Sequence, residues 1–172
     1  MQQKLQFIIT VLHEPKLLIF DEPFTGFDPI NTNLIKNEIL NLRDQGATIL
    51  FSTHNMESVE ELCDHIALIN NSKKILDGPV REIRNSHKTN TYEIGFKGDM
   101  DLFKKSLNGH ELLEENSLEG ITKAKVKLAG GAKLNDLLRQ VIAAVEVHHC
   151  TEIIPGIRDI FIYEVKKAGN NI

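Results

Sequence analysis

The chain has 172 residues, with 20 basic and 24 acidic side chains and a formal net charge of −4. Hydrophobic residues make up 41% and charged residues 26%, a globular composition that excludes a collagen-like, low-complexity or disordered acidic chain. The mild negative charge argues against a protein that binds nucleic acid by neutralising phosphates. No apolar run reaches the roughly 18 residues of a membrane-spanning helix, two cysteines are too few for a disulfide framework and no export signal is visible, so we expect a cytoplasmic protein.

The first half of the chain alternates helix and strand patterns, which predicts an α/β sheet. Residues 2–13 carry apolar side chains at helical spacing, and Glu14-Pro15 ends this helix; the apolar positions are Leu5, Ile8, Ile9 and Leu12. The unbroken apolar run at 17–20 predicts a strand that is covered on both faces, as in a parallel sheet, and 48–51 predicts a second buried strand of this kind. The other expected elements are helices at 30–45, 56–64 and 80–84 and a hairpin of strands at 66–69 and 74–76, joined by a turn at 70–73.

The second half has a different pattern, which predicts a small α+β domain. A polar stretch at 85–90 has no apolar anchors and is interpreted as a linker. The elements expected beyond it are strands at 92–97, 111–116, 121–128 and 146–154 and helices at 101–107, 134–145 and 157–165. The order β-α-β-β-α-β, followed by a terminal helix, is typical of a ferredoxin-like domain.

Two carboxylates follow the first buried strand. In open α/β sheets ligands bind at the carboxyl ends of the strands, so Asp21 and Glu22 would face a binding crevice. Asp21 would suit a magnesium ion, which prefers carboxylate, water and phosphate oxygens. Glu22 would point the other way and could accept a proton from an attacking water. The alternative, a solvated acidic turn, stays open on this segment alone.

Two further segments extend this pattern. Thr25–Pro29 predicts a tight turn in which Gly26 allows a positive φ and Asp28 opens the next helix, although an aspartate there is also a common structural N-cap. His54 directly follows the second buried strand. A histidine in that place is more often a hydrogen-bonded loop residue. Beside Asp21 and Glu22, however, it could contact the γ-phosphate of a ligand that those two residues also bind. A third candidate, His148-His149-Cys150, suggests zinc, yet neighbouring residues of a strand point to opposite faces, which favours a plain strand.

Together these motifs resemble the nucleotide-binding subunit of an ABC transporter. Residues 17–22 are similar to the Walker B strand with its catalytic glutamate, 25–28 to the D-loop, and His54 to the switch histidine. Phe27 stands where the family D-loop commonly has leucine. The resemblance implies that 1–84 form the C-terminal part of a P-loop ATPase core. Residues 91–172 are similar to the appended C-terminal domain of transporters that move drugs, lipids, sodium or polysaccharides.

The resemblance also implies a function, which is ATP hydrolysis in a head-to-tail dimer that energises a separate membrane permease. Asp21 would hold Mg²⁺ through water, Glu22 would polarise the attacking water, and His54 would bind the γ-phosphate of ATP. Asp28 would report across the dimer interface, and the signature-like residues Met1, Gln2 and Gln3 would border the segment that caps the partner's ATP. The subunit would lie on the inner face of the cell membrane and bind no nucleic acid.

One family motif is not present in this sequence. No segment has the form GxxxxGK followed by Ser or Thr, which cradles phosphates in P-loop enzymes. We therefore expect a fragment that starts within the signature motif, that binds ATP poorly alone and that exposes an apolar sheet edge in 1–80. Two alternatives stay open: a stand-alone interaction or regulatory module with a non-catalytic ATPase remnant, and a non-transport ABC ATPase of translation or DNA maintenance.

Overall fold

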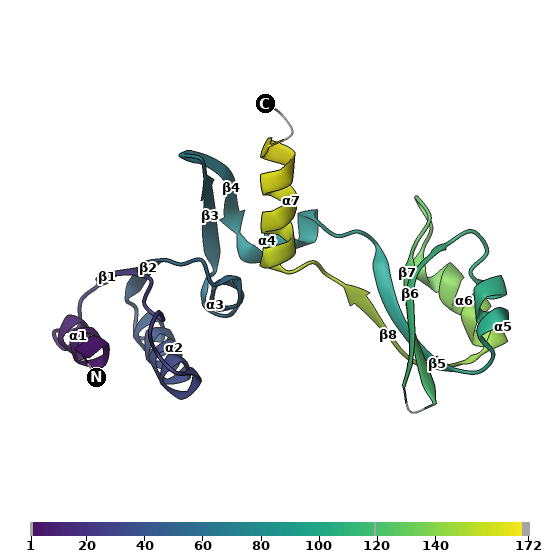
Figure 1. Ribbon diagram of the computed structural model, residues 1–172, viewed down its shortest axis with the longest axis horizontal. Coiled ribbons are helices and arrows are strands. Elements are labelled where there is room, and N and C mark those ends of the chain that lie inside the picture. The colour runs from purple at the N-terminus through teal and green to yellow at the C-terminus, as the bar shows by residue number, and fades with distance from the viewer. Residues whose placement is uncertain (1, 119, 170–172) are drawn as a thin grey trace. The chain divides into compact units, whose positions relative to one another are not determined.

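The computed structural model describes residues 2–118 and 120–169. The chain divides into two compact units, Met1–Ile66 and Ala67–Ile172. Each unit contains a hydrophobic core of its own. Figure 1 labels the helices and strands. The order of helices and strands is the predicted one throughout the described residues. None of the helices in this described part is long and apolar enough to cross a membrane.

The first unit is built on two parallel strands, with Leu17 opposite Thr48 and Asp21 opposite Ser52. Its core gathers on one face of this sheet and includes Phe7 from the first helix, Leu18 from the first strand and Ile39 from the second helix. The elements are α1 (Gln2–Val11), β1 (Leu17–Asp21), α2 (Pro29–Asp44), β2 (Thr48–Ser52) and α3 (Met56–Leu62).

The other face of this sheet is exposed, so the prediction that both strands are covered on both faces was wrong for the described residues. Leu18 is 2% exposed, whereas its neighbour Ile19 is 66% exposed and Leu50, opposite Ile19, is 60% exposed. Alternate side chains of a strand point to opposite faces, and both α1 and α2 contribute to the cluster on the Leu18 face. An unbroken apolar run does not show whether the segment that buries the second face of the sheet belongs to the same chain.

Helix α1 shows the same effect. Its predicted apolar positions are exposed, and the buried residue is Phe7, which stacks on Phe20 of β1 with ring centroids 5.6 Å apart; the exposed positions are Leu5, Ile8, Ile9 and Leu12. Helical spacing identifies an apolar stripe, but it does not identify the segment that covers the stripe. Large apolar side chains are therefore exposed on α1 and on one face of the sheet. The exposed apolar sheet edge expected in 1–80 stays a prediction.

A hairpin and a short helix follow. Strands β3 (His65–Asn70) and β4 (Lys73–Pro79) pair through a two-residue turn, and the boundary between the two units falls within β3. Asn71 and Ser72 have φ angles of 47° and 59°, the left-handed conformation that tight hairpin turns require at both central positions. Helix α4 (Val80–Ser86) continues from β4.

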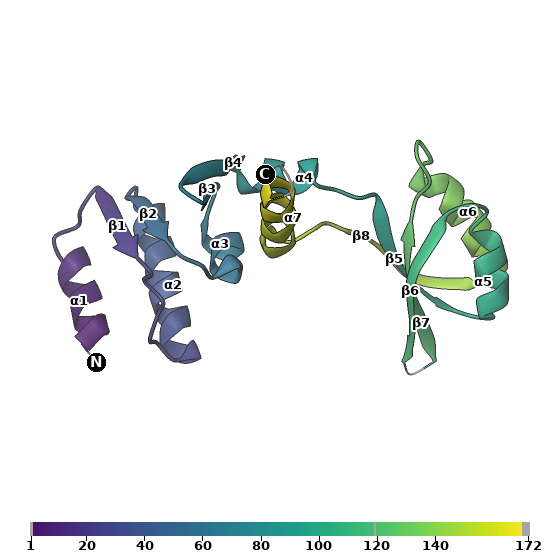
Figure 2. The same cartoon turned by 45° about the horizontal axis from the view of Figure 1, so that its top comes forward.

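The ferredoxin-like part is a four-stranded antiparallel sheet with the spatial order β6-β7-β5-β8. Its two helices lie side by side on one face of the sheet (Figure 1 and Figure 2). The second strand in sequence pairs with the third, and the first lies between the third and fourth, which is the predicted topology. Its elements are β5 (Thr91–Lys97), α5 (Met100–Ser106), β6 (Glu111–Leu118), β7 (Ile121–Lys127), α6 (Leu134–Ala144) and β8 (Glu146–Ile153).

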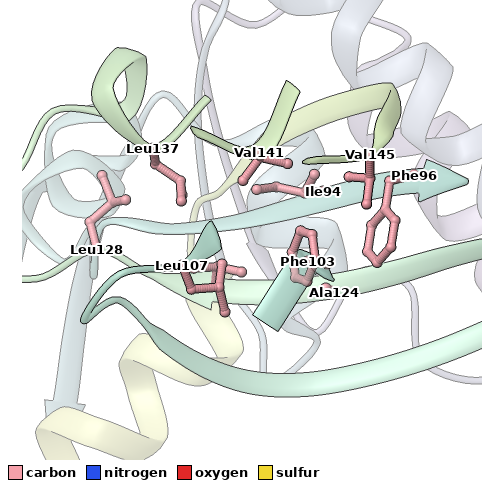
Figure 3. Packing of buried hydrophobic residues seen from close by; sticks show 10 residues of the cluster. Ile94, Phe96, Phe103, Leu107, Ala124, Leu128, Leu137, Val141 and Val145 are labelled. Atoms are coloured by element: carbon pink, nitrogen blue, oxygen red, sulfur yellow. The ribbon is translucent and has the colours of Figure 1, made fainter. Parts of the chain in front are cut away.

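The core of this part lies between the sheet and the two helices (Figure 3). Phe96 of β5 and Phe103 of α5 are fully buried and stack with ring centroids 4.1 Å apart. Ile94 of β5 and Val141 of α6 are also fully buried in this cluster. Alternating strand positions thus meet the apolar stripes of both helices, as the sequence pattern predicts.

The terminal helix α7 (Ile157–Gly169) packs against β4 and α4. His87, which follows α4, places Nε2 3.1 Å from Glu164 Oε1, and Arg84 Nε donates to the Pro155 carbonyl over 3.2 Å. The expected linker, 85–90, therefore includes the end of α4 and a residue that binds α7. The division of the chain at residues 84 and 91 stays a prediction.

The strand β8 contains the zinc candidate. His149 pairs with Gly95 of β5, and an added Cβ at Gly95 would lie 2.0 Å from the imidazole. The register between the two strands shifts just beyond this pair, between Gly95 and Phe96. His149 Nε2 faces Glu93 Oε1 at 3.2 Å, and burial raises the pKa of the Cys150 thiol. Among the described residues, no group of three or more His, Cys, Asp or Glu side chains could hold a metal ion.

Replacing Leu137 with alanine should strongly destabilise the ferredoxin-like part. Leu137 of α6 is 0% exposed, and a buried Leu→Ala change typically costs about 2–5 kcal/mol of unfolding free energy. Urea unfolding followed by tyrosine fluorescence measures it, because both tyrosines lie in the second unit and the chain has no tryptophan. The matched control is Ile142→Ala on the same helix, which is 62% exposed and should change stability by less than about 0.5 kcal/mol. Equal effects of the two changes would contradict this packing.

Candidate active site

The predicted site residues meet at one edge of the β1–β2 sheet. Because the strands are parallel and Asp21 is opposite Ser52, the segments that follow both strands leave the sheet at the same end. The Ser52 hydroxyl donates a hydrogen bond to Asp21 Oδ1, and the backbone N–H of Glu22 donates to the Ser52 carbonyl over 3.0 Å. These bonds continue the pairing of the strands by one residue and fix the start of the loop that carries Glu22.

Glu22 and His54 are in direct contact. Glu22 Oε1 lies 2.6 Å from His54 Nδ1 and also accepts the His54 backbone N–H over 3.0 Å. Glu22 Oε2 accepts hydrogen bonds from the hydroxyls of Thr53 (3.1 Å) and Thr25 (3.4 Å). A carboxylate only accepts, so the hydrogen-bonded His54 Nδ1 carries a proton, and Nε2 is the ring nitrogen that this contact leaves unused. The His54 side chain is 84% exposed, which leaves it accessible to a ligand.

The backbone of Glu22 is in a sparsely populated conformation. Its φ of 46° lies in the left-handed region, which side chains other than glycine, asparagine and aspartate seldom adopt. Neighbouring groups hold it there: the Thr25 backbone N–H donates to the Glu22 carbonyl over 3.2 Å, and both carboxylate oxygens are bound. A strained backbone conformation persists only where the surrounding structure holds the residue in place, and such conformations are concentrated at functional sites.

The charge of Glu22 follows from these contacts. The side-chain hydrogen bond with His54 is the main cause that lowers the pKa of Glu22, with further lowering by Thr53 and by the His54 backbone N–H. Partial desolvation acts in the opposite direction and is outweighed. Glu22 is therefore ionised at neutral pH and has its lone pairs engaged by donors.

The turn after Glu22 begins α2. Gly26 has a φ of 82°, as expected for this tight turn, and Asp28 caps α2 by accepting the Asn31 backbone N–H over 2.9 Å. That backbone hydrogen bond is the main cause that lowers the pKa of Asp28. The structure thus shows the N-cap role that the sequence allowed, and the interface role of Asp28 stays a prediction.

The signature-like residues are only partly described. The Gln3 amide lies against the turn, since a Cβ added at Gly26 would come within 2.9 Å of Gln3 Nε2 and Oε1. Met1 lies outside the described residues, and nothing is described of the Gln2 side chain.

Asp21 fits the donor set of a magnesium–nucleotide site. Mg²⁺ in such sites usually has one or two carboxylates and takes its other ligands from phosphates and water. The Asp21 carboxylate stands at the end of a strand, with one oxygen oriented by Ser52. A cage made by the protein alone is not found in the described part of the chain, where no group of three such ligands occurs.

The sequence interpretation gave no role to the hydroxyl residues around the two carboxylates. Ser52 binds Asp21, while Thr53 and Thr25 bind Glu22. The parallel alignment could have predicted these contacts. β1 and β2 have equal lengths and aligned ends, so the residues that follow β1 lie beside those that follow β2. The hydroxyls of Ser52 and Thr53 therefore fall beside the acids of β1.

Replacing His54 with alanine should raise the pKa of Glu22 toward its ordinary value, because the largest cause of its lowering is removed. A carboxyl whose folded-state pKa is depressed adds stability above its unfolded-state pKa, and this contribution is lost as pH falls through the folded-state pKa. An NMR pH titration of the Glu22 side-chain carboxyl measures the shift. Thr25→Val is the control: it removes the longest of these bonds, 3.4 Å, and should change the pKa much less. An unchanged pKa in His54→Ala would contradict the contact.

Known proteins resemble this chain over nearly all of its length. The family model for the C-terminal domain of DrrA1-3-like ATP-binding proteins matches residues 78–165. An uncharacterized ABC transporter ATP-binding protein of Alkalihalophilus pseudofirmus is 35% identical over 167 residues, which cover 97% of this chain and 61% of that protein. The uncharacterized ABC transporter ATP-binding protein YhaQ of Bacillus subtilis is 36% identical over 172 residues, covering 95% of this chain and 53% of that protein.

A solved structure described as the ATP-binding subunit of an ABC transporter is 31% identical, with a TM-score of 0.44, and the match covers 50% of this chain and 37% of that one. The chain spans between 53% and 61% of the length of the two relatives. The family match covers half of the chain and the two relatives align with nearly all of it. The chain therefore belongs to the ATP-binding proteins of ABC transporters, in the family with a DrrA1-3-like C-terminal domain.

Proposed function

We propose that this chain carries the hydrolytic end of the ATP site in the subunit that energises an ABC transporter. The observation that supports it most is the contact between Glu22, at the carboxyl end of β1, and His54, which follows β2, with 2.6 Å between Oε1 and Nδ1. A carboxylate and an exposed histidine at the carboxyl ends of parallel strands are suited to activating a water molecule and binding a phosphate.

Glu22 is the proposed general base for the attacking water. In the present geometry its Oε1 is occupied by His54, and this hydrogen bond lowers the pKa of Glu22 and with it its basicity. We propose that His54 turns from Glu22 to the γ-phosphate when ATP binds. That movement would release a lone pair on Oε1 and raise the pKa of Glu22 at the moment when a proton must be accepted.

Asp21 is the proposed Mg²⁺ residue and acts through bound water. Mg²⁺ supplies charge neutralisation of the phosphates when it is bound. The Ser52 hydroxyl orients one oxygen of the Asp21 carboxylate and leaves the other for the ion's hydration shell. The active protein would also contain a GxxxxGK loop followed by Ser or Thr, a motif that this 172-residue sequence does not contain.

The proposed assembly is a dimer of two such subunits bound to a separate permease at the inner face of the cell membrane. Asp28 and Gln3 would lie near the dimer interface together with Met1 and Gln2, and they would border the partner's nucleotide. The contact of Gln3 with Gly26 supports this grouping, because it joins the signature-like segment to the turn that ends at Asp28. Hydrolysis would open the closed dimer and drive the permease.

In the longer protein that contains the phosphate loop, Glu22→Gln should keep ATP binding and lose hydrolysis. The amide keeps the shape of the side chain but cannot accept the proton, and general-base catalysis typically contributes about 10²–10⁴-fold to the rate. Steady-state phosphate release and nucleotide binding are the measurements. Glu57→Gln is the matched control, because Glu57 is an exposed acid on α3, and its turnover should be unchanged. Undiminished turnover in Glu22→Gln would remove Glu22 from this role.

The 172-residue chain by itself should bind ATP with a Kd well above the micromolar range. Glu22, His54 and Asp21 contact the hydrolysed end of the nucleotide in this proposal, whereas most phosphate contacts come from the loop that the sequence does not contain. Isothermal titration of the purified chain with Mg-ATP measures it. Micromolar affinity would contradict the proposal that the phosphate-binding residues lie outside this sequence.

A further inference from the structure

Lys36 of α2 has an unusual environment for a lysine. Its side chain is only 11% exposed, and its Nζ lies 2.6 Å from Glu61 Oε2 of α3. The same ammonium lies 5.8 Å from the ring centroid of Phe24, in the loop after β1. A charge covered this well is costly to leave unpaired, so it holds its partners close. Lys36 thereby connects α2, α3 and the loop after β1, all within the first unit.

Both partners of Lys36 lie on segments that begin at the candidate active site: Phe24 on the loop that carries Glu22, and Glu61 on the helix that follows His54. Phe24 comes two residues after Glu22 and is buried, with its ring edge-on to Phe51 of β2 at 5.8 Å. Glu61 lies in α3, a helix whose N-cap, Asn55, directly follows His54 and accepts the Ser58 backbone N–H over 3.0 Å. The position of the start of α3 therefore determines the position of His54. The packing of Phe24 likewise determines the position of the loop that carries Glu22.

We propose that Lys36 is a positioning residue for the Glu22–His54 pair. Through Glu61 it holds α3, and through Phe24 it holds the loop after β1, so that the strained Glu22 and His54 stay in hydrogen-bond contact. Within the described part of the chain, Lys36 forms no hydrogen bond or ion pair with either residue of the pair. Its effect on the contact rests on the geometry alone, and its effect on hydrolysis rests on the proposed function.

The alternative is an ion pair that stabilises the unit without influencing the site. Lys36→Met keeps most of the aliphatic chain and removes the charge. Glu61→Gln removes the partner's charge at a side chain that is 50% exposed, so this second variant should fold even if the first does not. Lys74→Met is the matched control, because it removes the 2.8 Å ion pair with Asp77 in the other unit.

The test is NMR of the 172-residue chain at one fixed pH, which records the ring nitrogen shifts and the backbone amide shift of His54, the groups that contact Glu22 Oε1. In Lys36→Met and in Glu61→Gln we expect these His54 signals to move in the direction seen when Glu22→Ala removes the contact, with no change in Lys74→Met. The double variant should move the signals by no more than the larger single change, because both remove one interaction. Unchanged His54 signals in folded Glu61→Gln would overturn the proposal.

A second measurement separates this inference from the proposed function. In the longer protein, Glu61→Gln should lower kcat by roughly 10- to 100-fold and leave the KM for ATP nearly unchanged, as for a misplaced catalytic group. Moved His54 signals with full ATPase activity would support the positioning by Lys36 and contradict the role of the Glu22–His54 pair in hydrolysis. Lost activity with unmoved His54 signals would contradict the positioning.

Discussion

The parallel pairing of β1 with β2 is the constraint on which the candidate site depends. It aligns Asp21 with Ser52 and extends by the hydrogen bond from the Glu22 N–H to the Ser52 carbonyl. Beyond that point the segments after β1 and β2 form two loops that lie close together, and Glu22 on one loop contacts His54 on the other. A slip of the register by one residue would turn Asp21 to the other face and separate these groups.

The Glu22 loop combines strain with dense hydrogen bonding. A left-handed backbone at a glutamate costs free energy, and the donors on Thr53, His54 and Thr25 are what hold it. The same donors lower the pKa of the carboxyl, so geometry and charge are set together. A site of this kind responds to any movement of α3 or of the loop after β1, which is why the Lys36 contacts are relevant to it.

The two units bury their apolar surface to different extents. In the ferredoxin-like part, β5 and β7 place fully buried residues against both helices, and the core is closed within the chain. In the first unit, α1 and one sheet face leave large side chains exposed, among them Leu12, Ile19 and Leu50. Contiguous exposed apolar residues usually mark a contact surface. The same periodicity in the sequence therefore gave a covered core in one unit and an open face in the other.

The sequence by itself determined the order of helices and strands, the hairpin turn at Asn71-Ser72, the ferredoxin-like topology and the placement of Asp21, Glu22 and His54 at strand ends. These features follow from periodicity and turn chemistry, which act over a few residues. Only the tertiary structure decided which face of α1 is buried, that α7 packs on α4 and β4, and that Thr53, Thr25 and Lys36 hold the site. Those contacts depend on which segments the fold brings together. A local sequence pattern therefore does not predict them.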